Sequence, residues 1–178
     1  MKVPYNYLPQ EFADLDEIIE NWRILASSSE FTLGPVVEKW EKTFAKFVNS
    51  KYCVSTNNGT DALILALKSL GIGPGDEVIT VANTFYATVG AIVAVGATAV
   101  LVDSDTRFQI NVDTIEEFIT SKTRAIIPVH WAGASPCMTK IKKIASKHDI
   151  KIVEDACMGI GGKIHAKHPG TFGDLGAF

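Results

Sequence analysis

Two short segments carry residue types that could bind the two ends of one cofactor. The first follows a run typical of a strand and opens a predicted helix, so backbone N–H groups of Gly59, Thr60 and Asp61 are free to bind an anion such as a phosphate. In the second, Asp155 follows the predicted strand Lys151–Glu154. A carboxylate there lies at the carboxyl edge of a sheet, where open α/β sheets bind ligands. The pair could therefore bind a phosphorylated cofactor.

Each of these features also has an ordinary explanation. Gly59 and Thr60 could form a tight turn with a helix cap, and a lone carboxylate such as Asp155 more often lies on the surface. Together they favour pyridoxal phosphate, because the acid would keep the pyridine nitrogen protonated and let the ring withdraw electrons from the reacting carbon. Two more strand ends carry candidate groups. Phe85 could pack in the core or lie flat on a planar ring, and His130 could be structural or a substrate ligand.

Other patterns argue against several kinds of site. The glycine run Gly71–Asp76 follows a predicted helix and precedes a strand, the wrong order for phosphate binding, and Pro74 removes an N–H donor. His165 and His168 have no cysteine or carboxylate at ligand spacing, so we expect no metal. Neither a Gly-x-Ser-x-Gly elbow nor a His-Glu-x-x-His pair occurs.

The composition indicates a protein that acts on small molecules in the cytoplasm. The 178 residues are 47% hydrophobic and carry a net charge of −3 with both signs mixed, so we expect neither nucleic acid nor membrane as a partner. The start lacks the apolar core of a signal peptide, and no apolar run approaches the roughly 20 residues of a membrane span. Cys53, Cys137 and Cys157 lie in apolar stretches, which predicts reduced thiols in the core.

The hydrophobic pattern predicts an α/β fold with a largely parallel sheet flanked by helices. Apolar residues at helical spacing predict one helix that begins near Phe12 and ends near Ser27–Ser29, and another that begins at Gly34 and Pro35. Short apolar strands then alternate with helices, an order typical of parallel sheets. The predicted strands are Tyr52–Thr56, Glu77–Ala82, Thr98–Val102, Arg124–His130 and Lys151–Glu154, and the predicted helices are Thr60–Leu70, Thr84–Val95, Asp113–Ser121 and Pro136–His148.

This organisation predicts a helical arm over residues 1–50 and a cofactor-binding large domain over residues 51–178. After the last predicted strand, the glycine-rich sequence from Gly159 to Asp174 predicts a loop or hairpin. The chain then ends on the apolar residues Leu175–Phe178 without a polar tail. We therefore expect it to be the N-terminal part of a longer protein.

Several segments, taken in order, resemble the DegT/DnrJ/StrS aminotransferases, pyridoxal-phosphate enzymes of fold type I that act on nucleotide-linked keto sugars. The segments are Leu33–Pro35 with Trp40 and Glu41, Asn58–Leu63, Gly73–Ile79, Thr84–Thr88, Pro128–His130, Glu154–Ala156 and Gly170–Asp174. Each is weak alone, but their order and spacing make a specific signature. The resemblance implies an incomplete fold type I large domain.

The resemblance also implies roles for individual residues. The backbone around Gly59, Thr60 and Asp61 would bind the cofactor phosphate. Phe85 would stack on the pyridine ring, and Asp155 would pair with the ring nitrogen.

At Met158 the chain departs from the family pattern. Members often have glutamine there, three residues after the aspartate, where it hydrogen-bonds the phenolic oxygen of the cofactor; a thioether cannot donate that bond. Met158 would nevertheless occupy this position at the cofactor. The family's Schiff-base lysine would follow Phe178, so we expect no catalytic residue within the chain, which alone should be inactive and aggregation-prone.

For the intact protein, the resemblance implies a homodimeric aminotransferase. It would transfer an amino group from an amino acid, glutamate by analogy, to a nucleotide-linked keto sugar in surface polysaccharide or related sugar biosynthesis. Two alternatives stay open. A nucleotide-sugar 3-dehydratase of the same family would use pyridoxal phosphate with histidine in place of the lysine, and a non-catalytic regulator that binds sugar or cofactor would have neither residue.

Overall fold

The computed structural model describes residues 7–178 and consists of two compact units. One extends to Thr43 and the other covers Phe44–Phe178, so the boundary falls within helix α3 (Pro35–Val48). The division into an arm over residues 1–50 and a cofactor-binding domain stays a prediction. No helix in the described part of the chain combines the length and apolar character needed to cross a membrane.

In the described part of the N-terminal unit, from residue 7 on, two helices precede α3. These are α1 (Leu8–Glu11) and α2 (Asp16–Ser28), and neither has a buried residue. The predicted start of a helix at Phe12 is wrong, because Phe12 follows the end of α1 and α2 begins four residues later. Asp16 and Glu17 lie in the first turn of α2, where negative charge favours a helix start.

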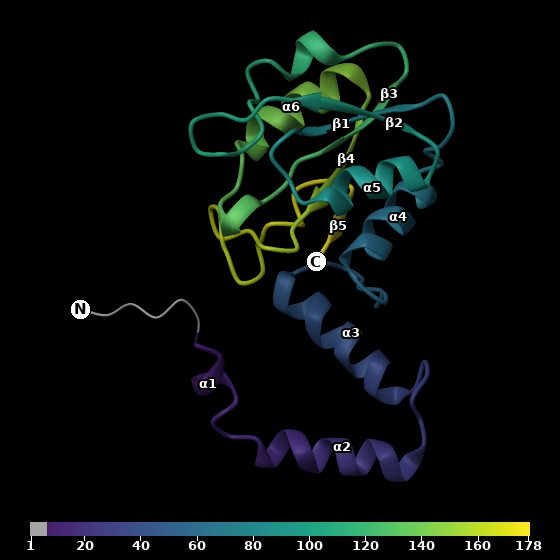
Figure 1. Ribbon diagram of the computed structural model, residues 1–178, viewed down its shortest axis with the longest axis vertical. Coiled ribbons are helices and arrows are strands. Elements are labelled where there is room, and N and C mark those ends of the chain that lie inside the picture. Colours follow the sequence, from purple (N-terminus) through teal and green to yellow (C-terminus); the bar gives the residue numbers. More distant parts are fainter. Residues whose placement is uncertain (1–6) are drawn as a thin grey trace, which may run out of the picture. The chain divides into compact units, whose positions relative to one another are not determined.

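The larger unit is built on a five-stranded sheet with helices on both faces (Figure 1). All neighbouring strands are parallel, which confirms the predicted α/β fold. In their spatial order the strands are β2 (Thr98–Val102), β1 (Glu77–Val81), β3 (Thr123–Ile127), β4 (Lys151–Asp155) and β5 (Leu175–Ala177).

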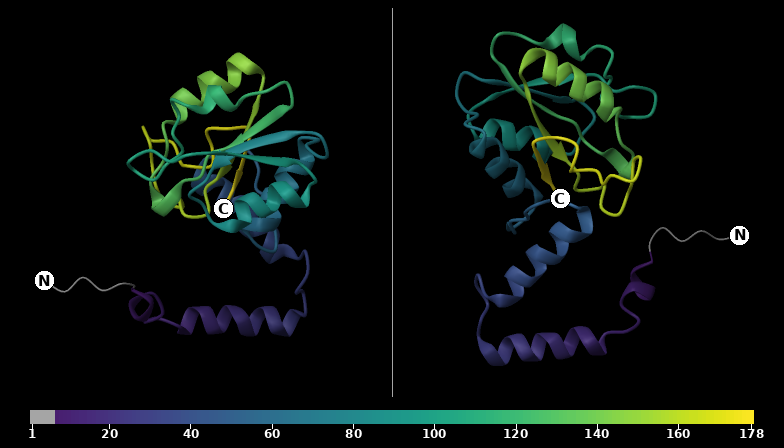
Figure 2. Two further views of the ribbon diagram at one scale, coloured as in Figure 1. Left: turned by 45° about the horizontal axis from the view of Figure 1, so that its top comes forward. Right: turned by 180° about the vertical axis from the view of Figure 1, so that it is seen from behind.

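Side chains on successive strand residues point to opposite faces, and each face has its own core. Helices α4 (Gly59–Ser69) and α5 (Tyr86–Ala94) cover one face, and α6 (Met138–His148) covers the other (Figure 2). In β1, Val78 packs in the core under α4 and α5, whereas Ile79 packs in the core under α6. The sheet is therefore buried on both sides, as its nearly continuous apolar strands predict.

The strand predicted at Tyr52–Thr56 is wrong. These residues are not part of the described sheet, and the side chains of Tyr52 and Val54 are exposed. An alternating apolar pattern favours a strand, but a strand forms only where a neighbouring strand is available to pair with it. The strand predicted over Arg124–His130 ends at Ile127 instead, because the next residue, Pro128, has no N–H to donate to a ladder.

The helix predicted over Asp113–Ser121 is only a short 3-10 helix, η1 (Ile115–Phe118). The sequence predictions placed α4, α5 and α6 to within two residues at each end. Among the helices predicted within the larger unit, the one in the connection between β2 and β3 is the one that does not form in full.

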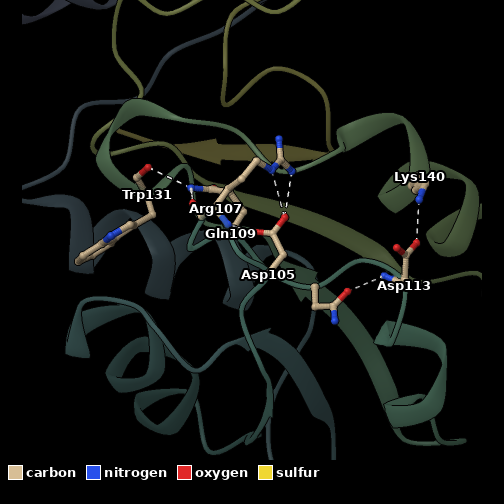
Figure 3. Close-up of polar contacts among 7 residues, drawn as sticks. Asp105, Arg107, Gln109, Asp113, Trp131 and Lys140 are labelled. Carbon is tan, nitrogen blue, oxygen red and sulfur yellow. Dashed lines mark hydrogen bonds and ion pairs between the residues drawn. The ribbon is translucent and has the colours of Figure 1, made fainter.

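Polar contacts fix this connection (Figure 3). The carboxylate of Asp105 accepts the backbone N–H of Gln109 at 3.1 Å, and the Gln109 amide donates to the Trp131 carbonyl at 3.2 Å. Lys140 of α6 pairs with Asp113 at 2.7 Å.

At the two ends of the predicted helix, side chains take backbone N–H groups. Asn111 Oδ1 accepts that of Asp113 at 3.2 Å, and the Thr123 hydroxyl accepts that of Thr120 at 2.9 Å. Such local side-chain bonds compete with helical ones.

Strand β5 was not predicted from the sequence because it has only three residues and two of them are Gly176 and Ala177. Gly176 is required by packing. A Cβ added to it would overlap severely with the carbonyl oxygen of Gly170. Gly170 itself has a φ of +83°, which favours glycine.

We predict that Gly176→Ala destabilises the protein by about 1–3 kcal/mol, because the added methyl group must displace backbone. Gly90→Ala is the matched control. Gly90 lies within α5, and a Cβ added there would have no atom within 4 Å, so alanine should stabilise the helix by roughly 0.5–1 kcal/mol. Urea unfolding of the intact protein measures both, and equal unfolding midpoints for the two variants would contradict the packing.

Candidate functional site

The predicted acid, Asp155, is the last residue of β4 and its carboxylate is buried. The residue is 7% exposed, and the hydroxyl of Thr88 in the first turn of α5 donates to its Oδ2 at 2.8 Å. The Thr84 hydroxyl lies 2.9 Å from that of Thr88. The Asp155 N–H donates to the Pro128 carbonyl at 3.0 Å. The structure thus fixes this carboxylate at the carboxyl edge of the sheet.

The preceding residue, Glu154, faces the opposite side of the sheet and is fully buried. Its carboxylate accepts four hydrogen bonds. The donors are His130 Nε2 at 2.8 Å and the backbone N–H groups of Gly170, Phe172 and Gly173 at 2.9, 2.5 and 2.6 Å. Glu154 therefore ties the glycine-rich loop before β5 to the end of β4.

The same contacts decide between the two interpretations of His130. Its Nε2 bonds to Glu154, its Nδ1 lies 2.7 Å from the Ser135 hydroxyl, and the side chain has no exposed surface. A histidine with both ring nitrogens partnered inside the protein has no atom left for a ligand. His130 is structural.

The start of α4 is capped by Asn58, whose Oδ1 accepts the N–H of Asp61 at 2.9 Å. Within residues 7–178, the N–H groups of Gly59 and Thr60 donate to no acceptor. Of the predicted anion-binding N–H groups, two are available and that of Asp61 is used by the cap. The helix dipole adds positive potential at the same place.

Cys157 brings the two predicted halves of the site together. Its Sγ lies only 2.6 Å from where a Cβ on Gly59 would be, so the cysteine side chain packs directly against the start of α4. The backbone N–H of Cys157 is 3.4 Å from Asp155 Oδ1. Burial, followed by the nearby charge of Asp155, raises the pKa of the Cys157 thiol to about 12.

The prediction of core thiols is wrong for two cysteines. All three are free, but Cys137 and Cys157 are exposed residues and Cys53 is half-buried. The apolar neighbours in the sequence gave the wrong prediction, because Cys137 lies just before α6 and Cys157 just after β4. At both places the chain turns at the surface.

Phe85 and Met158 lie at the ends of two different elements and are both exposed. Phe85 precedes α5 and is 56% exposed, with its ring 4.3 Å from that of Tyr86 at an angle of 49°. Met158 follows β4 and is 54% exposed. Phe85 is thus not a core residue, and more than half of its surface is accessible. Among the described residues no hydrogen bond joins either residue to Asp155, so their roles stay predictions.

Sequence reasoning missed Thr88 as a site residue. The resemblance included the segment Thr84–Thr88 without a role for its hydroxyl. The available signal was a threonine in the first turn of a helix that begins at the same sheet edge as Asp155. No group of residues in the described part of the chain has the composition of a metal site.

A shallow groove on the outer surface of α6 is a separate feature. It is lined by Thr139, Lys142, Lys143, Ser146, Lys147, Lys167 and Phe172. None of the predicted site residues is among them. Its lysines lie on one exposed helix face and a loop, so the groove offers positive charge but no buried convergent group. The strand ends are the better candidate for chemistry.

Comparison with known proteins identifies the family. Residues 13–178 match the DegT/DnrJ/EryC1/StrS aminotransferase family. The chain belongs to this family. It is 42% identical over 178 residues to UDP-N-acetyl-3-dehydro-alpha-D-glucosamine 3-aminotransferase of Acidithiobacillus ferrooxidans, covering 99% of this chain and 48% of that protein. It is 40% identical over 180 residues to the pleiotropic regulatory protein of Geobacillus stearothermophilus, covering 100% of this chain and 48% of the relative.

A solved structure of the same kind is NtdA from Bacillus subtilis with bound cofactor PMP. It superposes with a TM-score of 0.82 at 38% identity over 95% of this chain and 40% of the other. The chain therefore has the fold of the DegT/DnrJ/EryC1/StrS aminotransferases and spans about half the length of the curated relatives it matches.

We predict that Cys157 resists alkylation in the folded protein while Cys137 reacts. The thiolate is the nucleophile, and a pKa of about 12 leaves little of it for Cys157 at moderately alkaline pH. Labelling with iodoacetamide at about pH 8.5, near the ordinary thiol pKa, followed by mass spectrometry of the peptides, measures this. In urea both cysteines should react alike, and fast labelling of native Cys157 would contradict the raised pKa of its thiol.

Proposed function

We propose that this chain forms the cofactor-binding part of a pyridoxal-phosphate-dependent aminotransferase that acts on a nucleotide-linked keto sugar. One observation carries the proposal. Cys157 packs against Gly59 at the start of α4 and follows Asp155 by two residues, so an anion-binding helix start and a buried carboxylate belong to one site.

The residues present fit this cofactor. The free N–H groups of Gly59 and Thr60 would bind its phosphate, whereas the N–H of Asp61, also predicted for this role, is used by the Asn58 cap. Asp155 would hold a proton on the pyridine nitrogen, and the exposed face of Phe85 would cover the ring. When bound, pyridoxal phosphate supplies the electron sink and carries the amino group. The chain's own contribution is binding, orientation and the charge of Asp155.

The comparisons support the substrate class but leave its details as proposals. The relative from Acidithiobacillus is named for a UDP-linked amino sugar, and another relative, 40% identical, is named for a dTDP-linked one. We propose a nucleotide-linked keto sugar as the amino acceptor and an amino acid, glutamate by family analogy, as the donor. A homodimer in the cytoplasm and a role in surface polysaccharide biosynthesis complete the proposal.

A second candidate is a non-catalytic regulator that binds sugar or cofactor. The observation in its favour is the match over the whole chain to a relative named as a pleiotropic regulatory protein.

The 3-dehydratase alternative differs from the aminotransferase at the Schiff-base position, which would follow Phe178. Purification of the intact protein with pyridoxal phosphate and assay with a nucleotide-linked keto sugar and glutamate separates the three. Amino-sugar formation supports the aminotransferase, deoxygenation at position 3 the dehydratase, and binding without turnover the regulator.

Asp155→Asn in the intact protein is expected to lower kcat on the order of a hundredfold, because it removes a preorganised charge and keeps the shape. Asp113→Asn is the control. Asp113 is an exposed carboxylate in the connection between β2 and β3, and it pairs with Lys140 rather than with any predicted site residue. Its loss should therefore leave kcat unchanged. Steady-state kinetics on both variants, with cofactor content measured, checks this. Wild-type turnover in cofactor-loaded Asp155→Asn would refute the assignment.

Met158→Gln is expected to be tolerated and to shift the absorption of the bound cofactor, since an amide could donate a hydrogen bond to the phenolic oxygen and a thioether cannot. Ile160→Gln is the matched control, because Ile160 lies two residues further on in the same loop and is 55% exposed, almost the same as Met158. The absorption spectra of the two loaded variants should differ. Identical spectra would mean that residue 158 points away from the cofactor.

A further inference from the structure

Three side chains form an ordered chain of hydrogen bonds at the end of β4. A carboxylate only accepts, so the single proton of the Thr88 hydroxyl is committed to Asp155 Oδ2, at 2.8 Å. The Thr84 hydroxyl, 2.9 Å from Thr88, must then donate to Thr88. The direction of the chain is Thr84 to Thr88 to Asp155.

The middle member of this chain is held rigidly. Thr88 has no exposed surface and lies in the first turn of α5, with its N–H donating to the Phe85 carbonyl at 3.1 Å. Its neighbours Ala91 and Ile92 pack in the core beneath α5. The hydroxyl therefore has a fixed position relative to the sheet, and water does not compete for it.

The other donors to the same carboxylate are weaker. Oδ1 faces the backbone N–H of Cys157 at 3.4 Å, beyond the usual length of a good hydrogen bond. The thiol of Cys157 also interacts with Asp155, but a thiol is a poor donor. Thr88 thus takes one oxygen of Asp155 at short range and leaves Oδ1 as the better acceptor for a further donor.

We propose that Thr88 is a positioning residue of the cofactor site, which fixes the rotation of the Asp155 carboxylate so that Oδ1 is presented to the N–H of a bound pyridine ring. This inference rests on the proposed function. It predicts that the contribution of the ring nitrogen to cofactor affinity depends on a hydroxyl on another element of the fold, which does not itself touch the cofactor.

The test compares two ligands of the intact apoprotein: pyridoxal phosphate and its 1-deaza analogue, in which C–H replaces the ring nitrogen. Only the first can bond to Asp155. In the wild type the ratio of the two dissociation constants reports that bond. Thr88→Val, which keeps the shape and removes the hydroxyl, should reduce this preference about tenfold, the effect expected of losing one hydrogen bond to a charged group. Thr88→Ser should restore most of it.

Thr80→Val is the matched structural control. Thr80 is also a fully buried threonine, and its hydroxyl donates to the Ile127 carbonyl at 2.9 Å rather than to Asp155. It should lose stability in the same way as Thr88→Val but keep the wild-type preference between the two ligands. Thr84→Val leaves Thr88 in place and removes only the hydroxyl that donates to Thr88, so it should reduce the preference between the two ligands less than Thr88→Val does. It replaces Thr88→Val in the test if that variant does not fold.

The outcomes separate this inference from the proposed function. If wild-type protein binds pyridoxal phosphate and the preference is unchanged in Thr88→Val and Thr84→Val, Thr88 does not position Asp155. The same holds if Thr80→Val lowers the preference as much as Thr88→Val does. If the wild type binds neither ligand, the proposed function itself is wrong. A reduced preference in Thr88→Val with recovery in Thr88→Ser supports the inference.

Discussion

The alternation of side chains along β4 is the constraint on which the site depends. Two carboxylates follow one another in sequence, and the pleat of the strand sends Glu154 to one face and Asp155 to the other. Both are buried because β4 is an inner strand whose two faces are covered, with Thr88 of α5 beside Asp155 and the glycine-rich loop beside Glu154. A shift of register by one residue would exchange their surroundings. The short strand β5, with Gly176 against Gly170, is therefore part of what defines the site.

The two carboxylates have different numbers of hydrogen-bond donors around them, which indicates a structural role for Glu154 and leaves Asp155 able to bind a ligand. Glu154 meets four donors from His130 and the glycine-rich loop, so its hydrogen-bonding capacity is used within the protein. Asp155 meets one strong donor, Thr88, and two weak ones from Cys157. A buried carboxylate with spare acceptor capacity is suited to bind a ligand that brings its own N–H. The same strand end thus supplies an anchor and a candidate functional group.

The segment after Asp155 holds two residues beside the proposed cofactor site. Cys157 packs its sulfur against the start of α4, and Met158, exposed in the same segment, has no hydrogen-bond donor to offer a ligand. The Cys157 sulfur occupies the space that a side chain on Gly59 would need. Under the proposed function, substitutions at these two positions would change the surroundings of the cofactor without altering the strand.

The sequence by itself determined the class of fold and the nature of the two key groups. Apolar strands alternating with helices require a covered parallel sheet, and a glycine-containing helix start and an acid after a strand both belong at its carboxyl edge. Only the tertiary structure decided which groups are used. It made His130 structural, gave Thr88 its role beside Asp155, took the Asp61 N–H into a cap and left Tyr52–Thr56 outside the described sheet. The reason is physical: a pattern encodes which way a side chain faces, whereas hydrogen bonds depend on partners brought from distant parts of the chain.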